Sequence, residues 1–73
     1  MDISAEIKRV RQLNMLSQEE LARELGVSFA TVNRWETGKA KPTYRTLRLF
    51  DEFCQRRGIA SNLTFYVGQQ NGG

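Results

Sequence analysis

The 73-residue sequence contains no histidine, a single cysteine and a single proline. The lack of histidine excludes a Cys/His zinc cluster and a histidine-based catalytic centre, and one cysteine forms no intramolecular disulfide. This cysteine usage suits a reducing cytoplasm, which is the location we expect. A chain of this length builds one small core, which leaves little room for a multi-step active site. We therefore expect a protein that is not an enzyme and needs no metal, cofactor or small-molecule substrate.

Long hydrophobic runs and a strong excess of charge are also missing. The uninterrupted apolar stretches are only a few residues long, and the N-terminus alternates in charge, so secretion and membrane spanning are disfavoured. The net charge of +3 is too modest to indicate a nucleic-acid partner by itself. Its distribution is more informative. Residues 1–33 carry four basic and five acidic side chains, whereas residues 34–48 carry five basic side chains and one acidic one.

The most specific pattern in the chain reads LSQEELARELGVSFATVNRWETGKAKP and begins at Leu16. Ser17 and Glu20 have the spacing of a capping box, in which each side chain bonds the backbone amide of the other residue. Gly26 suits the left-handed conformation that ends a helix, and Ser28 suits the cap of the next helix. The pattern therefore predicts two short helices joined by a sharp turn.

The rest of the chain adds two helices and an extended segment. Helices are predicted over Ile3–Leu13, Gln18–Leu25, Phe29 to about Thr37, and Tyr44–Arg57. Asn14 is expected to take the left-handed conformation after the first helix. Beyond Gly58, apolar residues at every second position predict a strand, followed by a disordered end. We expect an all-α fold, with a compact four-helix domain over residues 1–58 and a strand-like tail over residues 59–73.

At these residues the chain resembles the phage-repressor-like (Cro/XRE) branch of the helix-turn-helix DNA-binding proteins, over about Ile3 to Phe53. The matching residues are Arg11, Leu16, Ser17, Gln18, Leu21, Ala22, Gly26, Val27, Ser28, Val32, Trp35, Glu36, Gly38 and Pro42. The resemblance implies a transcriptional regulator, a repressor among the possibilities, that binds double-stranded DNA and reads its major groove with the helix at residues 29–37. It also implies a partly buried salt bridge between Arg11 and Glu36.

Helical spacing turns Val32 and Trp35 toward the core and leaves the other side of their helix free to contact bases. The base-contacting candidates are Phe29, Ala30, Asn33, Arg34 and Gln18. Arg34 suits guanine and Asn33 suits adenine, while the two apolar side chains suit a thymine methyl group. Three of these residues have a plainer interpretation: Arg34 as a solvated residue with or without Glu36 as a partner, Asn33 as a solvated residue, and Phe29 packed against the preceding helix. Besides touching a base, Gln18 could bind a phosphate or brace Arg34, and its plainer interpretation is an ordinary first-turn residue.

A second set of residues is expected to hold the DNA backbone. The phosphate-contacting candidates are Ser28, Thr31, Lys39, Lys41, Tyr44 and Arg45. Ser28 is also a helix cap, and Tyr44 has the alternative of lying over Pro42. Arg45 is on a helix that must turn one face inward. No member of either set is expected to be catalytic.

One such module contacts few base pairs, so specificity implies a homodimer on a two-fold operator. The expected dimer contacts are Leu63, Phe65 and Val67, whose strand would pair with its copy or fold back on its own fourth helix. Two other functions remain open. One is a protein-interaction or antitoxin-like adaptor, which would not need the basic cluster, and the other is the DNA-targeting module of a larger protein.

Overall fold

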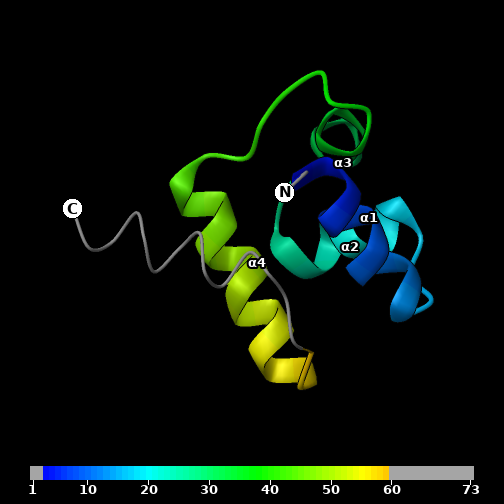
Figure 1. Cartoon of the computed structure of the whole chain (residues 1–73), viewed down its shortest axis with the longest axis vertical. Helices are drawn as coiled ribbons and strands as arrows, with labels where there is room; N and C mark the ends of the chain where they lie inside the picture. The colour runs from blue at the N-terminus through cyan, green and yellow to red at the C-terminus, as the bar shows by residue number, and fades with distance from the viewer. Residues whose placement is uncertain (1–2, 60–73) are drawn as a thin grey trace.

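The structure is a computed structural model that describes residues 3–59. Within them the chain forms α1 (Ile3–Leu13), α2 (Gln18–Leu25), α3 (Phe29–Glu36) and α4 (Tyr44–Arg57) (Figure 1). The predicted all-α fold is confirmed. The bounds agree with the prediction, except that α3 ends at Glu36 and Thr37 serves as its C-terminal cap. The predicted strand, with Leu63, Phe65 and Val67, lies outside the described residues, and the division of the chain at residue 58 stays a prediction.

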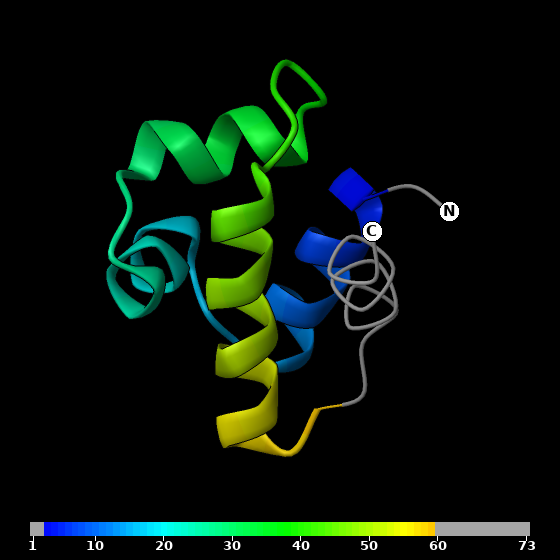
Figure 2. The same ribbon diagram turned by 90° about the vertical axis from the view of Figure 1, so that its left-hand side faces the viewer.

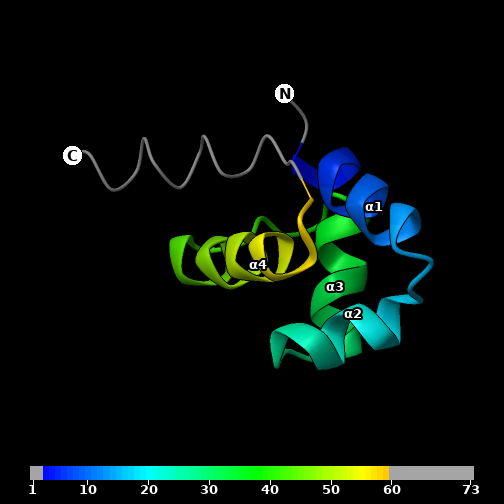
Figure 3. The same ribbon diagram turned by 90° about the horizontal axis from the view of Figure 1, so that it is seen from below.

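The four helices of the described residues surround one core. α3 packs against both α1 and α2, and α4 packs against α2. Figure 2 shows α3 lying across one end of α4, with the loop between them beyond that end. In Figure 3, α1, α2 and α3 gather on one side of α4. This arrangement leaves the side of α3 that faces away from the core at the surface. None of the helices between residues 3 and 59 is long and apolar enough to span a membrane.

The starts of three helices are set by hydroxyl caps. The capping box of α2 is complete: the Ser17 amide donates to Glu20 Oε1 at 2.8 Å, and the Glu20 amide donates to Ser17 Oγ at 3.0 Å. Ser28 caps α3 by accepting from the Thr31 amide, and Thr43 caps α4 in the same way. These bonds satisfy amides that have no partner inside a helix, so the sequence positions of the caps fix where the helices begin.

The ends of the helices share a Schellman motif, in which a left-handed residue follows the helix and the next amide bonds back into the last turn. The left-handed residues in the described part of the chain are Met15, Gly26, Gly38 and Gly58, with φ of 56°, 73°, 78° and 67°. The bonds that close the motifs include those from the amides of Leu16, Val27, Lys39 and Ile59. Since Leu16, Val27 and Ile59 also pack against the core, each of these motifs anchors the segment that follows it.

The expectation that Asn14 takes the left-handed conformation is wrong. Met15 does so, at φ 56°, while the Asn14 side chain donates to the carbonyl of Val10 at 2.8 Å. The Leu16 amide bonds to the carbonyl of Arg11 at 3.1 Å, and this bond places the left-handed position immediately before Leu16. Leu16, whose amide makes this bond, is partly buried and packs against the core.

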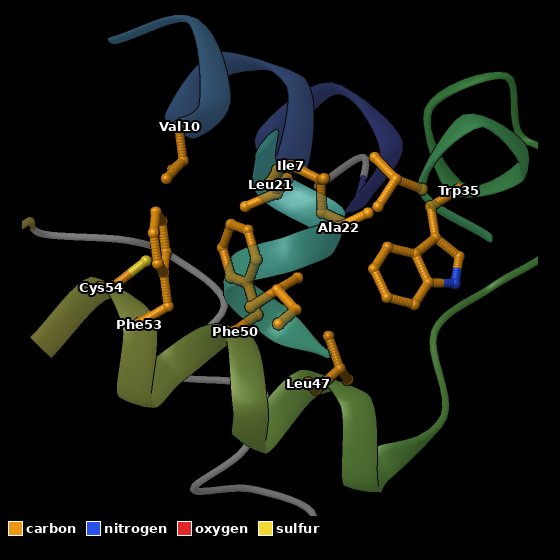
Figure 4. Packing of buried hydrophobic residues seen from close by; sticks show 11 residues of the cluster. Ile7, Val10, Leu21, Ala22, Trp35, Leu47, Phe50, Phe53 and Cys54 are labelled. Carbon is orange, nitrogen blue, oxygen red and sulfur yellow. The ribbon is translucent and has the colours of Figure 1, made fainter. Parts of the chain in front are cut away.

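The core is formed by apolar side chains from all four helices. Its members are Ile7, Val10, Leu21, Ala22, Leu25, Val32, Trp35, Leu47, Phe50, Phe53 and Cys54. Figure 4 shows Leu47, Phe50 and Phe53 projecting from α4 toward α1 and α2, with Trp35 at the side. The rings of Phe50 and Phe53 are 6.1 Å apart between centroids, in the range of a favourable tilted pair. Trp35 is 3% exposed, which fixes α3 by its inner face.

Candidate nucleic-acid interface

The outer face of α3 is available to a partner. Val32 and Trp35 are buried, so the opposite side of the helix faces solvent. Phe29 keeps 49% of its surface exposed, and Ala30 beside it is also exposed. A large apolar residue this exposed at the start of a helix is available for contact with a partner. Phe29 is therefore not packed into the core.

Arg34 is the charged member of this face, and its side chain is not used within the fold. Across residues 3–59 it makes no ion pair and no side-chain hydrogen bond. Glu36, its nearest acidic neighbour along the chain, is bonded to Arg11 and Gln18 instead. The guanidinium of Arg34 therefore keeps its donors for an external acceptor.

Arg11 and Glu36 form a bidentate ion pair that ties α1 to the end of α3. Arg11 Nε donates to Glu36 Oε2 at 2.6 Å, and Arg11 Nη2 donates to Oε1 at 2.9 Å. The remaining Nη1 donates to the carbonyl of Leu16 at 2.8 Å. The side chains are 13% and 3% exposed, respectively, so the pair is shielded from water. A fork of this kind restricts orientation as well as distance, and it fixes how α3 sits on α1.

Glu36 carries its charge because hydrogen bonds and neighbouring charges lower its pKa by more than burial raises it. Burial raises the pKa of Glu36, but hydrogen bonds from Arg11 and Gln18, with the charges of Arg11 and Lys8, lower it overall below the ordinary 4.5. The hydrogen bond to Glu36 raises the pKa of Arg11. Glu36 is therefore a carboxylate, an acceptor only, at neutral pH.

Gln18 extends this pair toward the surface of α3. Its Nε2 donates to Glu36 Oε1 at 3.0 Å, and its Oε1 accepts from Asn33 Nδ2 at 3.2 Å. Gln18 thus braces Glu36 and Asn33, not Arg34. Asn33 is half-buried and bonded, instead of freely solvated. Sequence reasoning missed this link, because the residues lie 15 positions apart on different helices and neither shows a local spacing signal.

Ser28 and Thr31 form a small hydroxyl pair at the start of α3. Ser28 Oγ lies 2.8 Å from Thr31 Oγ1 and accepts from the Thr31 amide at 3.1 Å. Ser28 is exposed and Thr31 is half-buried. Both hydroxyls lie at the helix end where free amides and the helix dipole favour an anion. Their position is compatible with a phosphate contact.

The loop after α3 presents its lysines outward. Ala40 packs against the core, while Lys39 and Lys41 on either side of it are exposed. The carbonyl of Arg34 accepts from the amides of Lys39 and Ala40, at 2.9 and 3.2 Å, which folds the loop back onto α3. Both lysines therefore lie in the loop immediately after α3, the helix that carries Arg34. At the start of α4, Tyr44 is half-buried and Arg45 is exposed.

A model of the family described as helix-turn-helix matches residues 7–57. The chain belongs to the Cro/C1-type (XRE) helix-turn-helix family. It is also similar to the HTH-type transcriptional activator BcrR of Enterococcus faecalis, with 32% identity over 53 residues. These residues are 73% of this chain and 26% of BcrR, so the chain spans about a quarter of that relative's length. No solved structure matches the chain significantly.

Membership in the helix-turn-helix family assigns roles to the two central helices. α2 and α3 are the helix pair, joined at Gly26, and α3 is the second helix of the pair. The chain is accordingly a DNA-binding domain of the class used in transcription regulation. In helix-turn-helix proteins the second helix of the pair is the one that lies in the major groove.

Proposed function

We propose that the protein is a non-enzymatic, sequence-specific regulator of transcription that binds double-stranded DNA by placing α3 in the major groove. The observation that carries the proposal is the state of Arg34, which is exposed and has no partner among residues 3–59, on a helix fixed by a shielded ion pair. An unengaged guanidinium on a rigid helix is suited to bidentate recognition of guanine. The role agrees with the expected cytoplasmic location.

The base contacts are assigned to the outer face of α3 and the start of α2. Arg34 reads guanine, Asn33 reads an adenine edge, and Phe29 with Ala30 contacts a thymine methyl group. Gln18 supports Asn33 and contributes its remaining N–H to a base or phosphate. The exposure of Phe29 and Ala30 supports their part in this assignment.

The backbone contacts are assigned to the two ends of α3 and the start of α4. The residues are Ser28, Thr31, Lys39, Lys41, Tyr44 and Arg45. The first two offer hydroxyls beside free amides, and the lysines offer charge on a loop anchored by Ala40. Such contacts hold the domain in register without reading sequence.

The functional unit is proposed to be a homodimer on a two-fold operator, with half-sites about one helical turn apart. The argument is one of specificity, because a single reading helix touches too few base pairs to find one site in a genome. The dimer contacts remain those expected from the sequence: Leu63, Phe65 and Val67.

Selection of bound duplexes from a random pool tests the proposal. We expect enrichment of one motif, in two copies related by two-fold symmetry if the protein dimerises. Enrichment of a single half-site would support sequence-specific DNA binding and contradict the proposed homodimer. If the selection enriches no sequence, the proposal is wrong and the adaptor function replaces it, in which this fold binds another protein.

A further inference from the structure

A chain of hydrogen bonds runs from a buried charge to the outer part of α3. Glu36 accepts from Arg11 and from Gln18 Nε2, and Gln18 Oε1 accepts from Asn33 Nδ2. The chain begins at a side chain that is 3% exposed and ends at a half-buried amide. Among the described residues, no buried side-chain nitrogen or oxygen atom lacks a hydrogen-bond partner.

The direction of every bond in this chain follows from the charge of Glu36. A carboxylate only accepts, so Gln18 must turn its NH₂ group toward Glu36. The carbonyl oxygen of Gln18 then points the other way, toward Asn33. Asn33 must in turn offer its NH₂ group to that oxygen. An amide flip at either residue would set two oxygens, or two NH₂ groups, against each other.

This direction leaves Asn33 with one donor and one acceptor for a partner. One Nδ2 hydrogen is used by Gln18, while the other hydrogen and Oδ1 remain. In the major groove, adenine shows an acceptor, N7, beside a donor, the N6 amino group. Guanine shows two acceptors, N7 and O6, so Oδ1 would face O6. The remaining pair of groups therefore complements adenine and opposes guanine.

We propose that Glu36 and Gln18 are positioning residues that set the amide direction of Asn33 and so make it select adenine over guanine. The proposal rests on the proposed function, because it requires α3 to lie in the major groove. Beyond that function, it states that the preference of Asn33 for adenine over guanine is set by the charge of Glu36, acting through the hydrogen bonds of Gln18. The identity of residue 18 should therefore control this preference.

Residue 18 offers two informative substitutions. Gln18→Met keeps the length but removes both polar groups, so Asn33 is free to turn either way. Gln18→Lys offers only donors, so Asn33 must turn Oδ1 inward and present two N–H groups, the pattern that guanine accepts. Gln12 is an exposed glutamine on α1, and Gln12→Met and Gln12→Lys are controls matched in size and charge.

The experiment uses the selected duplex and begins with Asn33→Ala, which identifies the base pair that residue 33 reads. At that pair the affinity ratio of adenine to guanine is measured for each variant. We expect roughly 5- to 150-fold preference for adenine in the wild type, the range of one bidentate pair. Gln18→Met should reduce it to within a few-fold of unity, and Gln18→Lys should reverse it, while both Gln12 controls keep it. A ratio cancels any uniform change in affinity, such as that from the added lysine charge.

A base analogue checks the same contact without changing the fold. Replacing that adenine by 7-deazaadenine removes N7, so the wild type should lose affinity and Asn33→Ala should not. The inference is overturned if Asn33→Ala alters no base preference, if the analogue affects both proteins equally, or if adenine is still preferred in Gln18→Met or Gln18→Lys. Each of these results leaves an enriched duplex, whereas failure of the proposed function would leave none.

Discussion

At the scale of single residues, the structure separates two kinds of ion pair. Arg11–Glu36 is shielded and bidentate, whereas Arg57–Glu24 is a single bond of 3.2 Å between side chains that are 37% and 41% exposed. Shielded pairs are costly to break because the remaining charge has lost its water, while exposed pairs contribute little. The two pairs therefore provide a matched comparison within one chain.

Glu36→Ala should lower the free energy of unfolding by about 3 kcal/mol, because it leaves Arg11 without its counter-charge. Glu24→Ala, the same chemical change, should cost less than about 1 kcal/mol. Urea unfolding followed by circular dichroism measures both. Equal losses would mean that Arg11–Glu36 contributes no more than a surface pair.

The pH dependence of stability follows from the same residue. The folded-state pKa of Glu36 lies below its ordinary 4.5, so the contribution of its charge is present above 4.5 and is lost as the pH falls through the folded value. Glu20, bonded to the Ser17 amide, has a pKa lowered in the same direction. Stability should fall below pH 4.5, and it should fall less in Glu36→Gln. A wild type and variant with identical pH profiles would contradict this assignment.

The outer face of α3 was predictable from one sequence, whereas the state of Asn33 was not. Helical spacing places Val32 and Trp35 inward, and the exposure of Phe29, Ala30 and Arg34 follows from it. The bond from Asn33 to Gln18 depends on how α2 and α3 cross. That geometry is set by packing between elements, and no local pattern in either helix contains it.

At the scale of elements, the ends of the helices follow from caps and left-handed residues. Serine, threonine and glycine signals at residues 17, 26, 28, 38, 43 and 58 all mark helix ends in the structure. α1 is the exception, because Met15 holds a position that favours glycine. The error at Asn14 arose because the left-handed position depends on where Leu16 meets the core, a tertiary contact that overrides local preference.

Met15→Gly should therefore stabilise the protein. The left-handed conformation costs an ordinary residue about 1–2 kcal/mol, and glycine removes this cost. Glycine also loses more chain entropy on folding, which offsets about half of the benefit, so the net stabilisation is about 0.5–1 kcal/mol. Met15 is 90% exposed, so little packing is lost. Gly26→Ala is the reciprocal control: its φ is 73° and its Cβ would meet nothing within 4 Å, so only the backbone is strained. Thermal unfolding should show opposite shifts, and shifts of the same sign would contradict this account.

At the scale of the whole molecule, basic side chains are concentrated in and after α3, the helix proposed to enter the major groove. The five basic residues of 34–48 are Arg34 on α3, Lys39 and Lys41 in the loop that follows it, and Arg45 and Arg48 in the first half of α4. Binding through phosphates releases counterions, so affinity should fall steeply with salt, by about 0.9 log units per log unit of salt for each phosphate neutralised. Affinity for a selected duplex, measured by fluorescence anisotropy across salt concentrations, gives this slope. A slope near zero would favour protein contact over DNA contact.

The central claim is that one surface divides its work between Arg34, which reads a base, and Lys39, which holds the backbone. The most direct test compares Arg34→Ala and Lys39→Ala on the selected duplex and on every single-base change of it. Arg34→Ala should abolish discrimination at one base pair, worth about 1–3 kcal/mol, and leave the others unchanged. Lys39→Ala should weaken all duplexes alike and reduce the salt slope by about one unit. If both variants bind every duplex as the wild type does, α3 does not lie in the groove and the account is wrong.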